Sequence, residues 1–170
     1  RCEEYKLAYP DLDLSIVIPI YNTVDLLPKL IDPILKTKLK IEIFLVDDGS
    51  DDGSKELCEK YAKENQRVYC ITQANKGAGV ARNLVMPLLT GKYSYFVDAD
   101  DMIDVGALER AVEFSELHDH DLTMFKYKIE FYEKQTSRGM WNADQELWNK
   151  LLKATNNKER KELAIQMINY

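Results

Sequence analysis

Three carboxylates follow a short run of β-forming residues near the middle of the chain. The sequence YSYFVDADD (93–101) places Asp98, Asp100 and Asp101 directly after residues that favour a buried strand. If extended geometry continues past the strand, side chains two residues apart share a face, so Asp98 and Asp100 can approach one ion. Oxygen ligands suit Mg²⁺ or Mn²⁺, and two carboxylates leave coordination positions for phosphate oxygens. Taken alone, a D-x-D pair is common in an acidic protein, and a solvated turn explains it equally well.

Two further polar clusters combine groups that can bind a nucleotide. In VDDGSDDGS (46–54), Asp47 and Asp48 leave another apolar run, where a carboxylate can accept from a pyrimidine N–H or a ribose hydroxyl. The second half of that motif is also explained by an Asx turn and a helix cap. In NKGAGVARN (75–83), Arg82 can reach a diphosphate or a sugar, or it can remain on the surface. A dinucleotide-binding fingerprint is not supported, because residue 82 is arginine where that motif has glycine or alanine.

Alternating strand and helix patterns predict a layered α/β fold that positions these clusters. The expected strands are residues 14–20, 41–46, 68–72, 93–97 and 122–132. The expected helices are residues 24–36, 54–65, 80–89 and 105–118, with two more within 143–170. Thr23, Ser54 and Asp104 are the expected helix caps. Because loops at the carboxyl ends of parallel strands meet at one edge of a sheet, the polar clusters should converge there.

The composition is typical of a globular domain and narrows the possible partners. Of 170 residues, 45% are hydrophobic and 31% are charged, enough to form a real core. The net charge of −6, without a run of Lys or Arg, argues against a nucleic-acid partner. The three cysteines lack C-x-x-C spacing and are interpreted as reduced thiols of a cytosolic protein. His118 and His120 form an H-x-H pair, but their acidic surroundings favour a solvated loop.

Taken together, the clusters resemble a known enzyme family. The segments LSIVIPIYN, FLVDDGSDDGS, QANKGAGVARN and YFVDADD, in this order, resemble the family 2 glycosyltransferases, which are inverting enzymes of GT-A fold. The resemblance covers roughly residues 13–132. It implies a Rossmann-like α/β fold with a mainly parallel sheet flanked by helices. It also implies a nucleotide-diphospho-sugar donor, commonly a UDP-sugar, and Mn²⁺ or Mg²⁺ held through the D-x-D motif.

The resemblance also assigns roles to individual positions. The residues that match the donor-binding segments of the family are Pro19, Tyr21, Asn22, Asp47, Asp48, Asn75, Lys76, Arg82 and Asp98. Of the two adjacent carboxylates, Asp48 is the first choice for holding the base. Asp98 and Asp100 match the metal-binding pair, and Asp100 is the expected direct ligand.

The general base that an inverting transfer requires is not apparent in the sequence. Most acidic residues after Asp101 fall in predicted helices or loops and none makes a convincing base, so we expect the base and the acceptor site beyond Tyr170. Residues 1–132 are then the donor-binding core, and residues 133–170 are a loop and helices that begin the acceptor part. The resemblance implies a glycan or lipid-linked acceptor in polysaccharide or cell-envelope synthesis, on the cytoplasmic side, with peripheral membrane association left open. The alternative is a catalytically incomplete or inactive nucleotide-sugar-binding domain.

Overall fold

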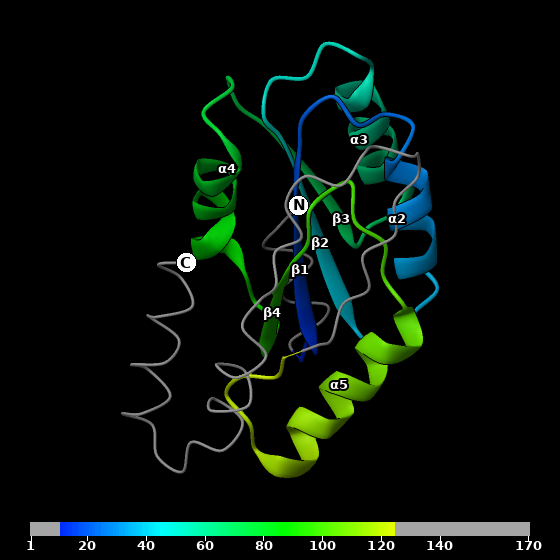
Figure 1. Cartoon of the computed structure of the whole chain (residues 1–170), viewed down its shortest axis with the longest axis vertical. Helices are drawn as coiled ribbons and strands as arrows, with labels where there is room; N and C mark the ends of the chain where they lie inside the picture. Colours follow the sequence, from blue (N-terminus) through cyan, green and yellow to red (C-terminus); the bar gives the residue numbers. More distant parts are fainter. Residues whose placement is uncertain (1–10, 125–170) are drawn as a thin grey trace, which may run out of the picture. The chain divides into compact units, whose positions relative to one another are not determined.

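The computed structural model describes residues 11–124, which form a four-stranded parallel sheet with helices on both faces (Figure 1). The strands are β1 (Leu14–Ile20), β2 (Ile41–Asp47), β3 (Val68–Thr72) and β4 (Tyr93–Phe96). The helices are α2 (Leu27–Ile34), α3 (Ser54–Glu64), α4 (Ala78–Val85) and α5 (Val105–His118), and a 3₁₀ turn, η1 (Met86–Leu88), follows α4. The predicted α/β fold with a parallel sheet is confirmed.

The order of the strands places the first strand at the centre of the sheet. The order is β3-β2-β1-β4, and every neighbouring pair is parallel. All seven residues of β1 and all seven of β2 are buried, as expected for central strands covered on both faces. The chain moves outward from β1 to β3 and then crosses back to place β4 on the other side of β1. Ligands of open α/β sheets bind at this kind of reversal, which here lies between β1 and β4.

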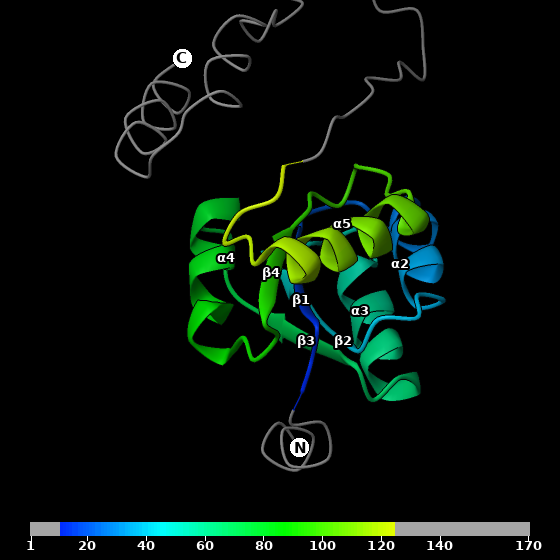
Figure 2. The ribbon, with the colours of Figure 1, turned by 90° about the horizontal axis from the view of Figure 1, so that it is seen from below.

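Side-chain alternation along the strands divides the core into two layers, one on each face of the sheet. Ile16 of β1 packs in the layer that contains Leu30 of α2 and Leu108 of α5. Its neighbour Val17 points to the opposite face and packs with Val85 of α4. Figure 2 shows α4 on one side of the sheet and α2, α3 and α5 on the other. Because successive side chains of β1 point to opposite faces of the sheet, this one strand contributes to both layers of the core.

The first helix is shorter than predicted, and Thr23 does not cap it. The helix α2 begins at Leu27 and ends at Ile34, where residues 24–36 were expected, and its cap position, Leu26, makes no side-chain hydrogen bond. The carbonyl of Thr23 accepts from the N–H groups of Leu26 and Leu27 at 3.0 and 3.2 Å, so a turn precedes the helix. Thr23 therefore contributes its backbone to this turn, and its hydroxyl has no hydrogen-bond partner among the described residues.

Ser54 was also predicted to be a helix cap, and this prediction is wrong. Ser54 is the first residue of α3, and Gly53, with a φ of 95°, occupies the cap position. The Ser54 hydroxyl accepts instead from the N–H of Thr23, at 2.9 Å. The predicted cap of α5 is confirmed, because Asp104 Oδ1 accepts from the N–H of Ala107 at 3.0 Å.

Other predicted elements differ at their ends or lie outside the described residues. The helix expected at 80–89 begins two residues earlier as α4 and ends as the 3₁₀ turn that contains Pro87, which has no N–H to continue an α-helix. Of the strand expected at 122–132, residues 122–124 are described and are not in a strand. The remainder of that segment, the two helices within 143–170 and the proposed domain boundary at 132 lie outside the described residues.

The cysteines and histidines of the described region agree with the sequence only in part, because His118, which was expected in a loop, is the last residue of α5. Cys58 is buried and Cys70 is half-buried, and both are free thiols; Cys2 lies outside the described residues. His118 and His120 are exposed at the end of α5, with their rings stacked at a centroid distance of 5.5 Å. Within residues 11–124, no helix combines the length and the apolar character needed to cross a membrane.

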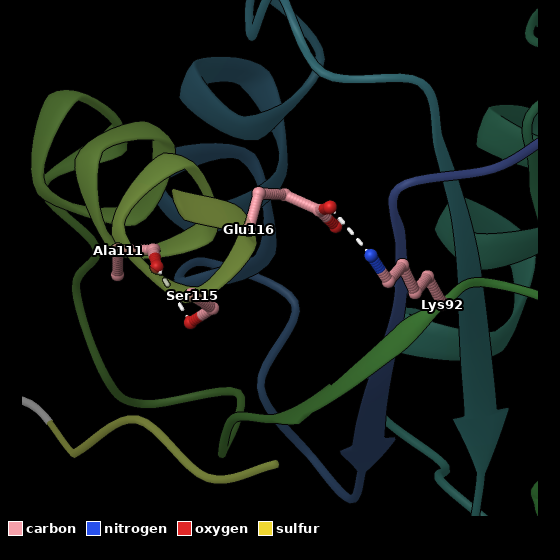
Figure 3. A network of polar contacts seen from close by, with 4 residues as sticks. All are labelled: Lys92, Ala111, Ser115 and Glu116. Atoms are coloured by element: carbon pink, nitrogen blue, oxygen red, sulfur yellow. Dashed lines mark hydrogen bonds and ion pairs between the residues drawn. The ribbon is translucent and has the colours of Figure 1, made fainter. Parts of the chain in front are cut away.

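An ion pair fastens the last described helix to the start of β4. Lys92 Nζ lies 2.5 Å from a carboxylate oxygen of Glu116 on α5 (Figure 3). The hydrogen bond to Glu116 raises the pKa of Lys92 above its usual value. Next to Glu116, the hydroxyl of Ser115 donates to the carbonyl of Ala111 one turn earlier, at 2.8 Å (Figure 3). The polar groups at this end of α5 thus bond both within the helix and to the strand that precedes the D-x-D motif.

A buried carboxylate holds the turn before β4 against the centre of the sheet. Glu42 of β2 is 1% exposed, and its Oε1 accepts from Ser15 Oγ at 2.6 Å and from Thr90 N at 2.6 Å. The N–H of Gly91 donates to the same Ser15 hydroxyl at 2.8 Å. A Cβ on Gly91 would lie 2.4 Å from the backbone nitrogen of Ser15, so only glycine fits this close approach.

We expect Gly91→Ala to destabilise the fold by about 1–3 kcal/mol, because the added methyl group overpacks against the backbone of β1. The control is Gly79→Ala, since a Cβ at that position in α4 meets no atom within 4 Å. Alanine is favoured over glycine inside a helix by about 1 kcal/mol, so this control should be neutral or stabilising. Urea unfolding midpoints at constant slope measure both changes. Equal midpoints for the two variants would contradict the packing argument.

Candidate functional site

A cavity of about 210 Å³ opens at the carboxyl ends of β1, β2 and β4. Five of the residues singled out in the sequence line it: Pro19, Tyr21, Asp48, Asp98 and Asp100. Pro19 belongs to β1 itself, and the other four come from the loops that follow β1, β2 and β4, which the strand order brings together. The cavity therefore lies where an open α/β sheet is expected to bind a ligand.

Four other residues complete the lining of the cavity, and sequence reasoning did not assign them to it. They are Ile20, Thr23, Ala78 and Ala99. Thr23 was assigned to a helix cap, although its place two residues after Tyr21 puts it in the same loop. Ala78 is the first residue of α4, where a small side chain leaves the space beside the helix open. Ile20 and Ala99 are neighbours of assigned residues, so their proximity in sequence was the available signal.

Asp48 is buried at the base of the cavity without a basic partner. It is 3% exposed, and its Oδ1 accepts from Gln73 Nε2 at 2.7 Å and from Lys76 N at 2.8 Å. Its Oδ2 accepts from Gly77 N at 2.7 Å. Burial by itself raises the pKa of Asp48, but these three hydrogen bonds outweigh it and hold the pKa below its usual value. Asp48 is therefore ionised at neutral pH and fixes the loop between β3 and α4.

Asp47 and Asn22 do not line the cavity but hold the loops around it. Asp47 is fully buried at the end of β2, and its Oδ1 accepts from Ser50 N at 3.2 Å. Its Oδ2 has no hydrogen-bond partner among residues 11–124. Asn22 is exposed, and its side-chain oxygen accepts from Asp51 N at 3.0 Å. The sequence could not decide firmly which of the two adjacent carboxylates would hold the base. In the structure Asp48 lines the cavity and Asp47 does not.

Asn75 and Lys76 are exposed residues in the loop that Asp48 holds. The backbone N–H of Lys76 contacts Asp48, whereas neither side chain lines the cavity. Gly49 allows this loop to come close, because a Cβ there would lie 3.0 Å from the nitrogen of Asn75 and its φ is +79°. The glycine of the first DDGS therefore permits the close contact between the two loops.

The D-x-D carboxylates project from alternate positions after β4. Val97 and Ala99 are buried, whereas Asp98 and Asp100 are exposed and both line the cavity. The chain is not extended here as the sequence argument assumed, because the carbonyl of Asp98 accepts from the N–H of Asp101 at 3.0 Å in a turn. Asp98 and Asp100 nevertheless line the same cavity. Burial, together with the charges of Asp100 and Asp98, raises the pKa of the next carboxylate, Asp101.

Arg82 of α4 reaches across to the first carboxylate of the D-x-D motif. Its terminal nitrogen NH2 is paired with Asp98 Oδ1, whose side chain remains 54% exposed. The Nε of Arg82 is buried without a partner among the described residues. Asp100 makes no ion pair with any residue between 11 and 124. Of the two carboxylates, Asp100 is therefore the one without a basic partner in the described region.

The donor set at the cavity fits a divalent cation that is only partly held by protein. In the described part of the chain, no group of three or more His, Cys, Asp or Glu side chains is arranged to hold a metal. A closed zinc site, which needs such a set, is not formed by these residues. Two carboxylates at the rim of a cavity match Mg²⁺ or Mn²⁺, which retain positions for water and phosphate oxygens.

The sequence profile of "Glycosyl transferase family 2" matches residues 15–168, nearly the whole chain. This chain belongs to glycosyl transferase family 2. The match begins at β1 and includes all four polar loops described above. The family resemblance of the D-x-D and DDGS motifs is therefore confirmed.

Curated relatives are longer than this chain. The chain is 37% identical to poly(ribitol-phosphate) beta-glucosyltransferase of Bacillus spizizenii over 122 residues. This alignment covers 69% of this chain and 19% of that protein. The chain is also 38% identical to glycosyltransferase GlyG of Streptococcus pneumoniae over 116 residues. That alignment covers 67% of this chain and 38% of that protein. The chain thus spans well under half the length of these family members.

Solved structures of two glycosyltransferases share the fold. S. aureus TarS 1–349 in complex with UDP matches with a TM-score of 0.59 and 27% identity, over 64% of this chain and 33% of that chain. Mannosyltransferase PcManGT of Pyrobaculum calidifontis, in complex with GDP-Man and Mn²⁺, matches with a TM-score of 0.54 and 22% identity. The second match covers 62% of this chain and 32% of that chain. The described sheet and helices therefore have the architecture of the GT-A fold.

We expect Asp48→Asn to lower the free energy of unfolding at pH 7 by about 1–3 kcal/mol, since an amide cannot accept all three hydrogen bonds. The pKa of Asp48 is depressed in the folded state, so its contribution is fully present above the unfolded pKa near 3.9. The difference between wild type and variant should therefore shrink as the pH falls below about 4.

Urea unfolding followed by circular dichroism between pH 3 and pH 7 measures this difference. The matched control is Asp51→Asn, an exposed carboxylate of the same loop, which should change stability by less than about 0.5 kcal/mol. A difference between wild type and Asp48→Asn that stayed constant with pH would show that the charge of Asp48 does not carry the stabilisation.

Proposed function

We propose that this chain is the donor-binding part of an inverting, metal-dependent glycosyltransferase that uses a UDP-sugar. One observation carries the proposal: a single cavity at the reversal of the sheet is lined by an exposed aromatic ring and by both carboxylates of a D-x-D motif. Tyr21, which is 52% exposed, offers a flat surface for a base. Asp98 and Asp100 line the same cavity and are suited to a cation that accompanies a diphosphate.

Asp48 retains one acceptor position for the base. A carboxylate has about four lone-pair positions, and three of them are used by Gln73, Lys76 and Gly77. Two of these bonds end on Oδ1 and one on Oδ2, so Oδ2 can accept one further hydrogen bond from the cavity. The N–H of a pyrimidine such as uracil supplies the required donor. Cytosine lacks this N–H at the corresponding ring nitrogen, so we assign Asp48 to recognition of uracil.

In the proposed enzyme Asp100 is the direct metal ligand, with Asp98 beside it. When bound, Mg²⁺ or Mn²⁺ would stabilise the negative charge that develops on the departing nucleoside diphosphate. Arg82 balances the charge of Asp98, a residue that lines the cavity, and its guanidinium can hydrogen-bond to a phosphate oxygen of a ligand bound there. The closely spaced negative charges at Asp98, Asp100 and Asp101 favour a cation at this position.

The acceptor side of the reaction is proposed to lie beyond the donor part. Within residues 11–124 the carboxylates that line the cavity are Asp48, Asp98 and Asp100, and each already has a role in holding the loops or the donor. We therefore place the general base outside the described residues. The B. spizizenii relative named above is by name a glucosyltransferase of poly(ribitol-phosphate), which supports our proposal of a glycan or lipid-linked acceptor of the cell envelope. We propose that the reaction takes place on the cytoplasmic side, at or near the membrane.

We expect Mn²⁺ to strengthen the binding of UDP to the wild type. We expect Asp100→Asn to weaken UDP binding in the presence of Mn²⁺ by about tenfold or more, equivalent to about 1.4 kcal/mol. The reason is that a neutral amide at Asp100 removes a negatively charged metal ligand. Isothermal titration calorimetry with UDP, in the presence and absence of Mn²⁺, measures the change. Asp119→Asn, an exposed position at the end of α5, is the control and should bind as wild type does.

A parallel titration with GDP tests the choice of base. Preference for UDP supports uracil recognition, whereas equal or tighter binding of GDP would contradict it. Metal-dependent UDP binding that survives in Asp100→Asn would contradict the assignment of Asp100 as the direct ligand.

We expect Tyr21→Ala to weaken UDP binding both with and without Mn²⁺, by about 1–3 kcal/mol, because stacking of a base on an aromatic ring does not require the metal. Tyr21→Phe keeps the ring and should retain most of the affinity. The same calorimetric titrations measure both variants. Loss of affinity in Tyr21→Ala that appeared only with Mn²⁺ present would place Tyr21 near the diphosphate and exclude a stacking role.

A further inference from the structure

Three consecutive backbone N–H groups after β1 are each bonded to a side chain of the loop after β2. Asn22 N donates to Ser50 Oγ at 3.0 Å, and Thr23 N donates to Ser54 Oγ at 2.9 Å. Val24 N donates to Asp52 Oδ2 at 3.0 Å. The three acceptors alternate along the sequence at positions 50, 52 and 54. We call Ser50, Asp52 and Ser54 the latch.

Further contacts make the connection between the two loops reciprocal. Asp51 N donates to Asn22 Oδ1 at 3.0 Å, so Asn22 both donates to this loop and accepts from it. Asp48 N donates to the carbonyl of Ile20 at 2.8 Å, immediately before Tyr21. Asn22 has a φ of 52°, a left-handed conformation that asparagine tolerates better than most residues. The chain from Ile20 to Val24 is therefore held at successive residues.

The latch provides acceptors that the segment before α2 does not provide for itself. The cap position of α2, Leu26, makes no side-chain hydrogen bond, and the hydroxyl of Thr23 has no partner among the described residues. Asp52 also accepts from Ser54 N at 2.9 Å, which fixes its carboxylate between the two loops. Burial raises the pKa of Asp52, but its hydrogen bonds to Ser54 and Val24 outweigh this and lower it. Asp52 is thus ionised at neutral pH and accepts from both N–H groups.

None of the three latch residues lines the cavity, whereas the segment they hold does. Tyr21 and Thr23 flank Asn22, and both line the cavity. Tyr21 is 52% exposed, so few contacts to its own ring fix its position. The direction of its side chain therefore depends on the backbone from residue 20 to residue 24.

We infer that Ser50, Asp52 and Ser54 are positioning residues that set the place of Tyr21 in the nucleotide pocket without touching the nucleotide. This inference rests on the proposed function, because it assigns the latch to the same UDP site. It gives the second half of the DDGSDDGS motif a role beyond that of a local turn. Ser50, which holds the residue next to Tyr21, is expected to have the most direct effect on the pocket.

The test compares Ser50→Ala with Ser50→Thr, which keeps the hydroxyl, and with Asp51→Asn as the control in the same loop. The side chain of Asp51 makes no hydrogen bond to any of the described residues. Amide hydrogen exchange at residues 22–24, followed by NMR on the 170-residue chain, reports the latch bonds without any nucleotide. We expect exchange at Asn22 to rise about three- to tenfold in Ser50→Ala, as the loss of one hydrogen bond predicts. Ser50→Thr and Asp51→Asn should exchange as wild type does.

Nucleotide titrations then ask whether the latch acts through Tyr21. We expect Ser50→Ala to weaken UDP binding about three- to tenfold. Binding of pyrophosphate with Mn²⁺, which reports the D-x-D side of the cavity, should not change. In a Tyr21→Ala background, Ser50→Ala should have no further effect on UDP affinity, because the two residues act as one unit in a double-mutant cycle. A purely structural role would weaken both ligands and would persist in that background.

The outcomes separate this inference from the proposed function. Faster exchange together with a Tyr21-dependent loss of UDP affinity supports the positioning role. Faster exchange with unchanged UDP affinity, or an equal loss in the Tyr21→Ala background, overturns it while leaving UDP binding intact. If wild type does not bind UDP under any condition, the proposed function fails and the positioning role fails with it. The exchange rates would in that case still show whether the latch bonds exist.

Discussion

The arrangement of the site depends on the burial of the charge of Asp48. Transfer of a carboxylate from water to a protein interior costs several kcal/mol when the charge is unpaired. No cation pairs with Asp48 in the described region, and three N–H donors from the loop between β3 and α4 take that place. Hydrogen bonds to a charged group contribute about 1.5–3 kcal/mol each, so three of them are enough to offset the cost. The same residue donates its own N–H to the end of β1, and this connects three loops.

Hydrogen bonds of this kind explain how the loops around the cavity are held together although they are polar and largely exposed. The loops after β1 and β3 both donate hydrogen bonds to residues that follow β2. Asp48 holds the loop after β3, and the side chains at 50, 52 and 54 hold the loop after β1. The repeated DDGS motif therefore accepts hydrogen bonds from two neighbouring loops, the one after β3 and the one after β1. Its two glycines have φ values of 79° and 95°, which lets the chain turn between one set of contacts and the next.

The fold class could be predicted from the sequence because it depends on local periodicity. The runs at β1 and β2 are mainly apolar, and the helices between the strands have apolar residues at helical spacing, so strand type and order follow. The convergence of polar loops then follows from the geometry of parallel strands. The assignments of Thr23 and Ser54 as helix caps were wrong because the hydrogen bonds of these residues are not local. Their local signals are correct for a helix start, but Ser54 bonds to Thr23, 31 residues away, and no local rule includes that partner.

The separate roles of Asp47 and Asp48 could not be derived from the sequence, because they depend on the register of β2. Asp47 continues the strand as the partner of Ile20 and Thr72, which places its side chain in the interior. The next residue leaves the strand and points to the cavity. A shift of one residue would exchange these positions, and the pattern of two adjacent aspartates is compatible with both. The register is set by the apolar residues of β2, which must divide correctly between the two layers of the core.

The ion pair between Arg82 and Asp98 decides how the D-x-D motif can receive a charged ligand. An ion pair between exposed groups contributes about 0–1 kcal/mol, so little free energy is lost when one partner moves to a new one. A diphosphate at the cavity would offer Arg82 a second anion, and a divalent cation would offer Asp98 a stronger positive charge. Each exchange replaces a weak contact by a contact between more highly charged groups. Asp98 and Arg82 therefore pair with one another without forming a bond too strong for a ligand to replace.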